Sequence, residues 1–327
     1  MLSLNSPINA ADIYTAKALA PGHPVFKLDG FGDDRGKIDS VVVKLETNQS
    51  SANVQAAAMI MTVVDRNART EALKPLEVGQ LKLWAQGGEV PDVDAFQTAL
   101  DLARQLEIPG AWVKMDVKRL TMLDGAVKKR LDPANPDKAD VRLIARALKK
   151  HGGLEKLGEI IAADLFNGNT DRFGPPFELQ PGRGPGGIPL DAIYNVGNVF
   201  VACDGKGRGS PIGLDNYDPA SEWKDLNNGD IDPNRWGGML LHPRRKADRE
   251  QYAGLIVSDL EALLGPRNRK FSLSSKNRLG SGRKRRIRNG MGSGAKKLKR
   301  ALQRWQRTSP SGRLKAGVTA KMAALGW

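Results

Sequence analysis

Three short polar segments in the second half of the chain carry the side chains that transfer of a phosphoryl group requires. In that reaction one carboxylate orients the attacking hydroxyl, while an amide oxygen and a second carboxylate hold the Mg²⁺ that neutralises the phosphates. Asp171 is the candidate for the first role, in a turn supported by Arg172 and Asn169. Asn198 and Asp215 are the candidate metal ligands.

Periodic apolar residues predict the elements that would position these side chains. Residues 154–166 have the spacing of an amphipathic helix that runs into the Asn-Gly-Asn turn before Asp171. Residues 199–201 and 212–214 are typical of two strands of a hairpin, with a candidate ligand at the end of each. Asp and Asn are also common turn formers, so each segment alone indicates only a loop. The order of helix, turn, hairpin and carboxylate favours a site.

A glycine-rich turn nearer the N-terminus is a candidate for contacts with phosphates. Residues 25–28 and 40–45 are predicted strands, and three glycines follow the first of them, Gly30, Gly32 and Gly36. Glycines allow backbone N–H groups to approach phosphates closely. Lys44, near the end of the second strand, is long enough to reach the α- and β-phosphates.

The three segments together resemble the catalytic core of the atypical kinases. The resemblance lies in Asp-Arg-Phe after a helix, Gly-Asn before a strand and the later Leu-Asp-Asn, and it is strongest over residues 155–217. The nearest likeness is to the actin-fragmin kinase catalytic domain, with the phosphoinositide kinases more distant. It implies ATP and Mg²⁺ in the cleft of a kinase, and a protein Ser/Thr as acceptor rather than a lipid.

The resemblance also implies a fold. We expect an α+β, two-lobed protein-kinase-like fold with a small sheet-containing N-lobe, a mainly helical C-lobe and a basic C-terminal tail. The predicted boundaries are an N-terminal segment over 1–20, the N-lobe over 21–118, the C-lobe over 119–265 and the tail over 266–327. Backbone groups near Met115 and Val117 would then contact the adenine. Within the N-lobe, residues 73–84 alternate like a half-buried strand, which Pro75 limits to an edge or a start.

Two features depart from the kinase pattern. Between Asp171 and Asn198 lie 26 residues, many of them Gly and Pro, where most kinases leave about four. The helix predicted over residues 50–64 lacks the Glu that pairs with the strand lysine in kinases, and Gln55 holds its place. Gln55, Glu46 or Glu71 would then partner Lys44, or the lysine assignment is wrong.

Two other functions fit the same residues. The scaffold would also suit an enzyme that transfers the nucleotide instead of the phosphate, and the segments named above do not separate the two reactions. A degenerate kinase-like binding module is the second alternative, favoured by the missing helix Glu and by the long insertion. The presence of all three candidate residues, Asp171, Asn198 and Asp215, disfavours it, because a scaffold does not need them.

The charge of the chain is concentrated at its C-terminal end. The sequence has 51 basic and 36 acidic residues, and residues 267–327 hold 19 of the basic ones and no acid. Residues 295–305 have the spacing of a basic amphipathic helix that carries Leu298, Leu302 and Trp305 on one side. We expect this tail to be a separable, mostly disordered segment that binds an anionic membrane or nucleic acid. The Trp slightly favours a membrane surface.

Composition narrows the remaining classes. No apolar run approaches the 18 residues of a transmembrane helix, and residues 1–20 lack the features of a Sec signal peptide. The prediction is therefore a cytoplasmic protein, or one exported without a cleaved Sec signal. Cys203 is the single cysteine, and the three histidines have no metal-ligand spacing.

Overall fold

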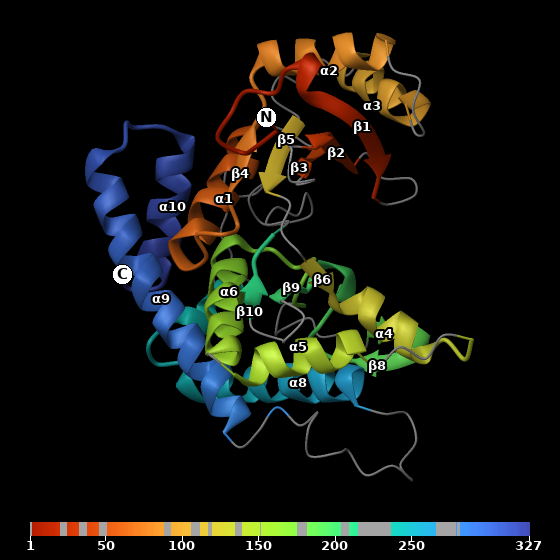
Figure 1. Ribbon diagram of the computed structural model, residues 1–327. Coiled ribbons are helices and arrows are strands. Elements are labelled where there is room, and N and C mark those ends of the chain that lie inside the picture. Colours follow the sequence, from red (N-terminus) through yellow and green to blue (C-terminus); the bar gives the residue numbers. More distant parts are fainter. Residues whose placement is uncertain are drawn as a thin grey trace. The chain divides into compact units, whose positions relative to one another are not determined.

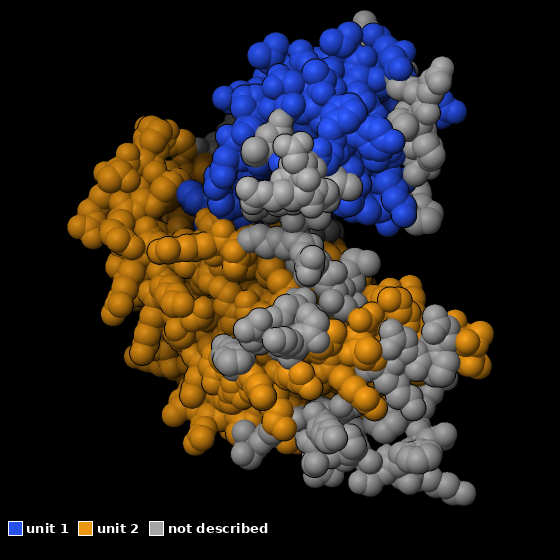
Figure 2. Space-filling model, in the orientation of Figure 1, with its two compact units in different colours: residues 1–59, 68–118 blue, residues 60–67, 119–327 orange. Residues whose placement is uncertain are grey.

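The computed structural model of the chain describes residues 2–19, 25–32, 38–45, 51–87, 93–105, 112–116, 120–134, 139–150, 152–174, 182–203, 209–214, 237–265, 279 and 282–327. These residues form an α+β fold with small antiparallel sheets, which confirms the predicted class at that level. The chain divides into two compact units (Figure 2). Unit 1 comprises residues 1–59 and 68–118, and unit 2 comprises residues 60–67 and 119–327.

Unit 1 is built on a five-stranded antiparallel sheet (Figure 1). Its strands lie in the order β1 (Ile13–Ala18), β2 (Val25–Gly32), β3 (Ile38–Leu45), β5 (Trp112–Asp116) and β4 (Thr70–Ala72). Buried Phe26 lies opposite Val43, and buried Leu28 opposite Val41. They share a core with Phe96 of α3 (Val93–Gln105) and with α2 (Pro75–Gly87). Helix α1 (Ser51–Val64) connects β3 to β4, and its last turn is counted with unit 2.

The prediction of a strand over residues 73–84 is wrong, because residues 75–84 belong to helix α2. Pro75 occupies the first helical position, where its missing N–H costs no hydrogen bond. Glu77 accepts a hydrogen bond from the Lys74 backbone N–H at 3.0 Å, as the Glu of a capping box does. Glu77, Leu81 and Ala85 are buried at helical spacing. The start signal at Pro75 therefore outweighs the apparent alternation.

Residues 1–20 are part of unit 1 rather than a separate segment. They supply strand β1 and the buried side chains of Leu2 and Ile8 to the core. Gly30 lies within β2 opposite Ile13, not in the turn that follows. A Cβ at Gly30 would come within 3.1 Å of the Asp12 carbonyl oxygen and 3.3 Å of that of Asp39. The close approach of the backbones on either side therefore gives Gly30 a packing role.

Unit 2 combines a three-stranded sheet with helices. The sheet order is β10 (Gly209–Ile212), β9 (Phe200–Cys203) and β6 (Leu120–Met122). A hairpin is confirmed here, but its second strand ends at Ile212 rather than covering the predicted residues 212–214. A separate two-stranded hairpin consists of β7 (Gly182–Gly184) and β8 (Ile188–Leu190). The helices are α4 (Leu123–Leu131), α5 (Ala139–Lys149), α6 (Gly153–Asn167), α8 (Lys246–Leu264), α9 (Arg283–Thr308) and α10 (Arg313–Ala324). Across the described part of the chain, no helix has the length and apolarity needed to cross a membrane.

The expected separable, mostly disordered tail is wrong for residues 282–327. Helix α9 lies alongside α6 (Figure 1) and buries Ile287, Met291, Leu298 and Leu302. Four ion pairs join cations of α9 to glutamates of α6 and α8, namely Arg286–Glu155, Lys297–Glu159, Arg288–Glu250 and Arg283–Glu261. A cut at Gly265 would therefore strip α6 of a packed neighbour.

Glycines let the backbones of α6 and α9 approach closely. A Cβ at Gly158 of α6 would overlap the Ile287 carbonyl oxygen and lie 2.9 Å from the Gly290 Cα. A Cβ at Gly290 would overlap the Glu155 carbonyl oxygen, and one at Gly294 would lie 2.8 Å from the Ala162 Cβ. The glycine-rich sequence of α9 thus packs the helix rather than serving as a spacer.

Replacement of Gly290 by Ala is expected to destabilise unit 2 by about 1–3 kcal/mol, because the new methyl overlaps a backbone atom of α6. Gly292→Ala is the matched control on the same helix, since no atom outside the helix lies within 4 Å of its Cβ position. The control should stabilise the protein by about 0.5–1 kcal/mol through helix propensity. Urea denaturation of both variants measures the difference. Equal effects would contradict the close packing of α6 and α9.

Candidate active site

The turn that carries Asp171 begins where α6 ends. Gly168 has a left-handed backbone conformation, with φ of 68°, which favours glycine. The Asn169 N–H bonds back to the Asp164 carbonyl at 2.9 Å, and the Asn169 side-chain oxygen accepts the Asp171 N–H at 3.1 Å. These contacts stop the helix and set the direction of the Asp171 segment. Asn169 therefore supports the turn as the sequence predicts.

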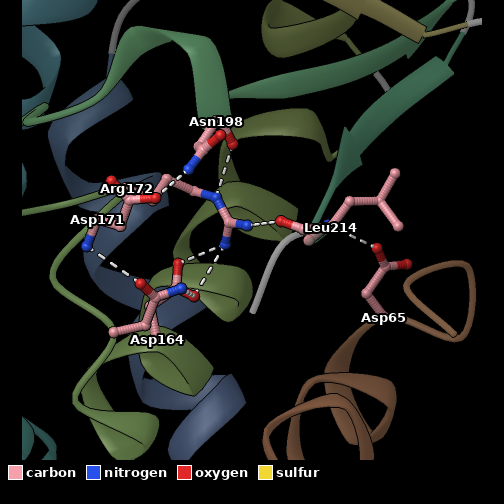
Figure 3. A network of polar contacts seen from close by, with 8 residues as sticks. Asp65, Asp164, Asp171, Arg172, Asn198 and Leu214 are labelled. Atoms are coloured by element: carbon pink, nitrogen blue, oxygen red, sulfur yellow. Dashed lines mark hydrogen bonds and ion pairs between the residues drawn. The ribbon is translucent and has the colours of Figure 1, made fainter. Parts of the chain in front are cut away.

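Arg172 connects the three polar segments that contain Asp171, Asn198 and Leu214 (Figure 3). Its side chain is 1% exposed, and its Nη1 donates to both carboxylate oxygens of Asp164 at 2.8 and 2.7 Å. Nε donates to the Asn198 carbonyl at 2.7 Å, and Nη2 donates to the Leu214 carbonyl. One buried guanidinium thus holds the end of α6, the turn that precedes β9 and the residue before Asp215.

The partner of Arg172 is an equally buried carboxylate. Burial raises the pKa of Asp164 from its usual 3.8 to about 6, against the opposing effect of the Arg172 charge. The amide of Asn169 also donates to Asp164, at 3.3 Å. At neutral pH the carboxylate is therefore ionised and paired. A buried pair adds little net stability compared with well-packed apolar residues, but removal of one partner is costly.

The carboxylate of Asp171 is oriented by two amides. Its Oδ1 accepts a hydrogen bond from Asn195 Nδ2 at 3.1 Å, and its Oδ2 accepts one from Asn198 Nδ2. The side-chain oxygen of Asn195 accepts the Gly197 N–H at 2.9 Å, which shapes the 195–198 turn. Asn198 thus uses its amide nitrogen on Asp171, and its backbone carbonyl on Arg172 (Figure 3).

The segment that leads to Asp215 is held on both sides. Strands β9 and β10 pair with Phe200 opposite Ile212, so Asn198 and Leu214 leave the hairpin at the same end. The Gly213 N–H donates to Asp65 at 3.0 Å, while Arg172 binds the Leu214 carbonyl. Asp65 is 1% exposed, and one of its oxygens lies 3.3 Å from Lys156 Nζ. Asp215 itself lies outside the described residues.

Helix α8 fixes both ends of the long insertion between Asp171 and Asn198. The Tyr252 hydroxyl donates to the Gly174 carbonyl at 2.7 Å. The carboxylate of Asp259 accepts the backbone N–H groups of residues 191–193 at 3.2, 2.7 and 2.8 Å. Phe173 also forms an isolated bridge with Ile193. The insertion therefore leaves the turn and returns to it at anchored points.

The nucleotide-binding residues expected in unit 1 stay predictions. Lys44 lies on β3 opposite Val25 and Val113, and Gly32 ends β2. Met115 is on β5, but its side chain and that of Gln55 lie outside the described residues, as do all of Glu46, Gly36 and Val117. Glu71 forms an ion pair with Arg69 on the same edge of the sheet.

Three acceptors that build the site escape the sequence analysis. Asp164 and Asp65 each stand as a lone acid at the end of an apolar helical run, and Asn195 precedes the predicted hairpin. A single acid within an apolar helical run is a signal in itself, because a carboxylate that becomes buried needs a partner. The partner of Asp164 is eight residues away, and the Gly213 N–H that Asp65 accepts is 148 residues away. Only the folded chain reveals the second of these.

The C-terminal helix supports the same end of α6. Lys321 is fully buried, and its Nζ donates to the Phe166 carbonyl at 2.9 Å. The Phe166 ring stacks on Trp327, with centroids 5.6 Å apart. A cation at the last carbonyls of a helix is favourable for the helix dipole. Residues near the end of the chain thus hold the helix turn that precedes Asn169.

Lys321→Met is expected to destabilise the protein by about 1–3 kcal/mol, because it removes a buried donor and leaves the Phe166 carbonyl unsatisfied. Lys315→Met is the control on the same helix, where the amine contacts the part-buried Ser309 carbonyl. Its effect should stay below about 1 kcal/mol. Thermal unfolding followed by circular dichroism compares the two. A control as damaging as Lys321→Met would argue against this support of α6.

Comparisons of the chain with protein-family models, with curated proteins and with solved structures gave no match. Within the described residues, no three His, Cys, Asp or Glu side chains gather as a metal-binding group. Asp215 lies outside those residues.

Proposed function

We propose that the chain is an ATP- and Mg²⁺-dependent phosphotransferase of the atypical kinase type that phosphorylates a Ser or Thr of a protein. The observation that carries the proposal is the set of contacts made by Arg172. It binds the Asn198 and Leu214 carbonyls and the Asp164 carboxylate. Asp171, Asn198 and the residue before Asp215 therefore meet around one side chain. The same residue types have the same three roles in phosphoryl transfer.

Each residue has a role that follows from its chemistry. Asp171, held by two amides, would accept a hydrogen bond from the substrate hydroxyl and orient it for attack. The amide oxygen of Asn198 and the carboxylate of Asp215 are donors of the kind that Mg²⁺ prefers. The ion would neutralise the charge of the phosphates as the phosphoryl group moves. Arg172 and Asn169 would position these groups without contacting the substrate.

The order of elements in unit 1 supports a kinase-like fold. Lys44 lies on the third strand of an antiparallel sheet, and helix α1 follows that strand directly in the chain. Protein kinases place their phosphate-binding lysine on the third strand, with a helix after it. Lys44 is accordingly the proposed phosphate ligand, and Gln55 of α1 stands where kinases have the paired Glu.

Incubation of the full chain with γ-labelled ATP, Mg²⁺ and a library of Ser/Thr peptides tests the proposal. We expect phosphoryl groups on a peptide or on the protein itself, and none when Mg²⁺ is chelated. Mass spectrometry of the product distinguishes a phosphoryl adduct from a nucleotidyl adduct. A nucleotidyl product would contradict the reaction class. Failure to bind ATP in calorimetry would favour the degenerate binding module.

A further inference from the structure

Helix α9 has a second face that the packing against α6 leaves exposed or half-buried. Six cations lie on it without a carboxylate partner within the described residues, namely Arg285, Lys296, Lys299, Arg300, Arg304 and Arg307. Four other cations of α9 differ from these six because each pairs with a glutamate, namely Arg283, Arg286, Arg288 and Lys297. We call the six unpaired cations the basic face of α9.

The basic face is continuous along the helix. Because α-helical residues advance by about 100° each, positions 285, 296, 300 and 307 fall on one side. The span from Arg285 to Arg307 is about 33 Å at 1.5 Å per residue, close to the ~34 Å repeat of a nucleic-acid duplex. No acid occurs anywhere in residues 267–327 to interrupt the charge. The face is therefore complementary to an extended polyanion.

The packing of α9 argues against a membrane as that polyanion. Amphipathic helices bind membranes by inserting their apolar side chains into the interface. Here Leu298 and Leu302 are buried against the body, with exposures of 0% and 1%. Trp305, the residue that favours a membrane in the sequence, lies seven positions after Leu298 on the packed side and is half-buried. The basic face itself is purely polar.

The same geometry distinguishes a duplex from a single strand. Binding of single strands relies on exposed aromatic rings that stack on bases, and the basic face has none. The six side chains of the basic face are all Arg or Lys, which contact the phosphate oxygens of a duplex. Phosphate contacts position a protein on a duplex without reading its sequence.

We propose that the basic face of α9 binds the phosphate backbone of a nucleic-acid duplex without sequence preference. The helix is already ordered by its packing on α6, so binding does not pay the entropy of folding a basic tail. Asn289 and Gln303, whose helical positions fall among the cations, add neutral hydrogen-bond donors for phosphate oxygens. This nucleic-acid binding is independent of the proposed phosphotransfer site, because none of the site's residues belongs to the basic face.

Fluorescence anisotropy with a labelled DNA duplex of mixed sequence tests the proposal on the full chain. The logarithm of the binding constant should fall with the logarithm of salt concentration, with a slope of about −0.9 for each phosphate neutralised. The test variant carries Lys296→Gln, Arg300→Gln, Arg304→Gln and Arg307→Gln. We expect it to bind roughly a hundredfold more weakly near 0.1 M salt, with a slope smaller in magnitude by about 3 to 4.

The control variant makes the same change in net charge elsewhere in unit 2. It carries Arg142→Gln, Arg183→Gln, Arg244→Gln and Lys246→Gln, all at exposed positions. We expect it to bind the duplex within about threefold of the unmodified chain, and thermal unfolding checks that both variants fold. Should the fourfold variant not fold, Arg304→Gln alone should still reduce the slope by about 1.

Three results would overturn the proposal. An equal loss of binding in the test and control variants would assign it to diffuse net charge. A single strand of the same length that binds more tightly than the duplex would reject the duplex as partner. Tighter binding to phosphatidylserine vesicles than to the duplex, lost only in the test variant, would make a membrane surface the partner instead.

Discussion

Asp171→Asn is expected to reduce phosphotransfer by about a hundredfold or more while the protein remains folded. The carboxylate accepts hydrogen bonds from the amides of Asn195 and Asn198. An amide at position 171 keeps only one acceptor oxygen, so one of these contacts is lost. The cost in stability should be about 0.5–1.5 kcal/mol, the net contribution of one hydrogen bond. The loss of activity would then greatly exceed the loss of stability.

Initial rates with labelled ATP, together with thermal unfolding of the same preparations, measure both effects. Asp191→Asn is the matched control, because Asp191 is an exposed acid in the same unit, and its backbone N–H, which donates to Asp259, is kept in the variant. It should keep nearly full activity. If Asp171→Asn turned over as fast as the unmodified chain, the assignment of the acceptor-orienting carboxylate would be wrong.

Local patterns predict the parts of the site that depend on nearby residues. The helix before the turn follows from periodicity over about a dozen residues, and two short apolar runs predict a hairpin, although its second strand lies earlier than residues 212–214. The helix α2 was not predicted, because its alternation mimics a strand and the decisive signals are Pro75 at the first position and the cap by Glu77. In this segment the helix-start signals at Pro75 and Glu77 override the alternation of apolar residues.

Long-range contacts account for what the sequence could not predict. Glycines and cations in residues 283–308 have the composition of a linker, yet Gly290 and Gly294 permit the backbone contacts that fasten α9 to α6. The structural role of each glycine depends on the residue that it contacts, which lies more than a hundred positions earlier in the chain. The same holds for the Leu214 carbonyl, whose partner Arg172 lies 42 residues away. The composition of residues 283–308 is that of a linker, but the linker role that it suggests is wrong.

Arg172→Gln is expected to destabilise the protein by about 3–5 kcal/mol and to abolish phosphotransfer. The substitution leaves the Asp164 carboxylate, 1% exposed, without its cation. It also removes the donor from the buried Leu214 carbonyl and from the part-buried Asn198 carbonyl, and the unsatisfied buried acceptor would add to the cost. The three segments of the site would then lose their common contact. Urea denaturation and initial rates measure the two losses.

The effect of Arg172→Gln should depend on pH in a defined direction. In the folded protein burial already raises the pKa of Asp164 to about 6, above its usual 3.8, and loss of the neighbouring cation would raise it further. A group whose folded pKa is raised binds its proton more tightly in the native state, so its contribution to stability falls as pH rises above about 4. The variant should therefore be less destabilised at pH 5 than at pH 8.

Addition of Asp164→Asn to Arg172→Gln separates stability from function. The second substitution removes the unpaired carboxylate, so the double variant should be more stable than Arg172→Gln alone at pH 8 and should lose the extra pH dependence. Phosphotransfer should stay low, because Arg172 then no longer ties the Asn198 and Leu214 carbonyls to the turn that carries Asp171. Recovery of activity along with stability would show that Arg172 acts only through the charge of Asp164. Continued loss would identify its contacts with the two carbonyls as the link that assembles the site.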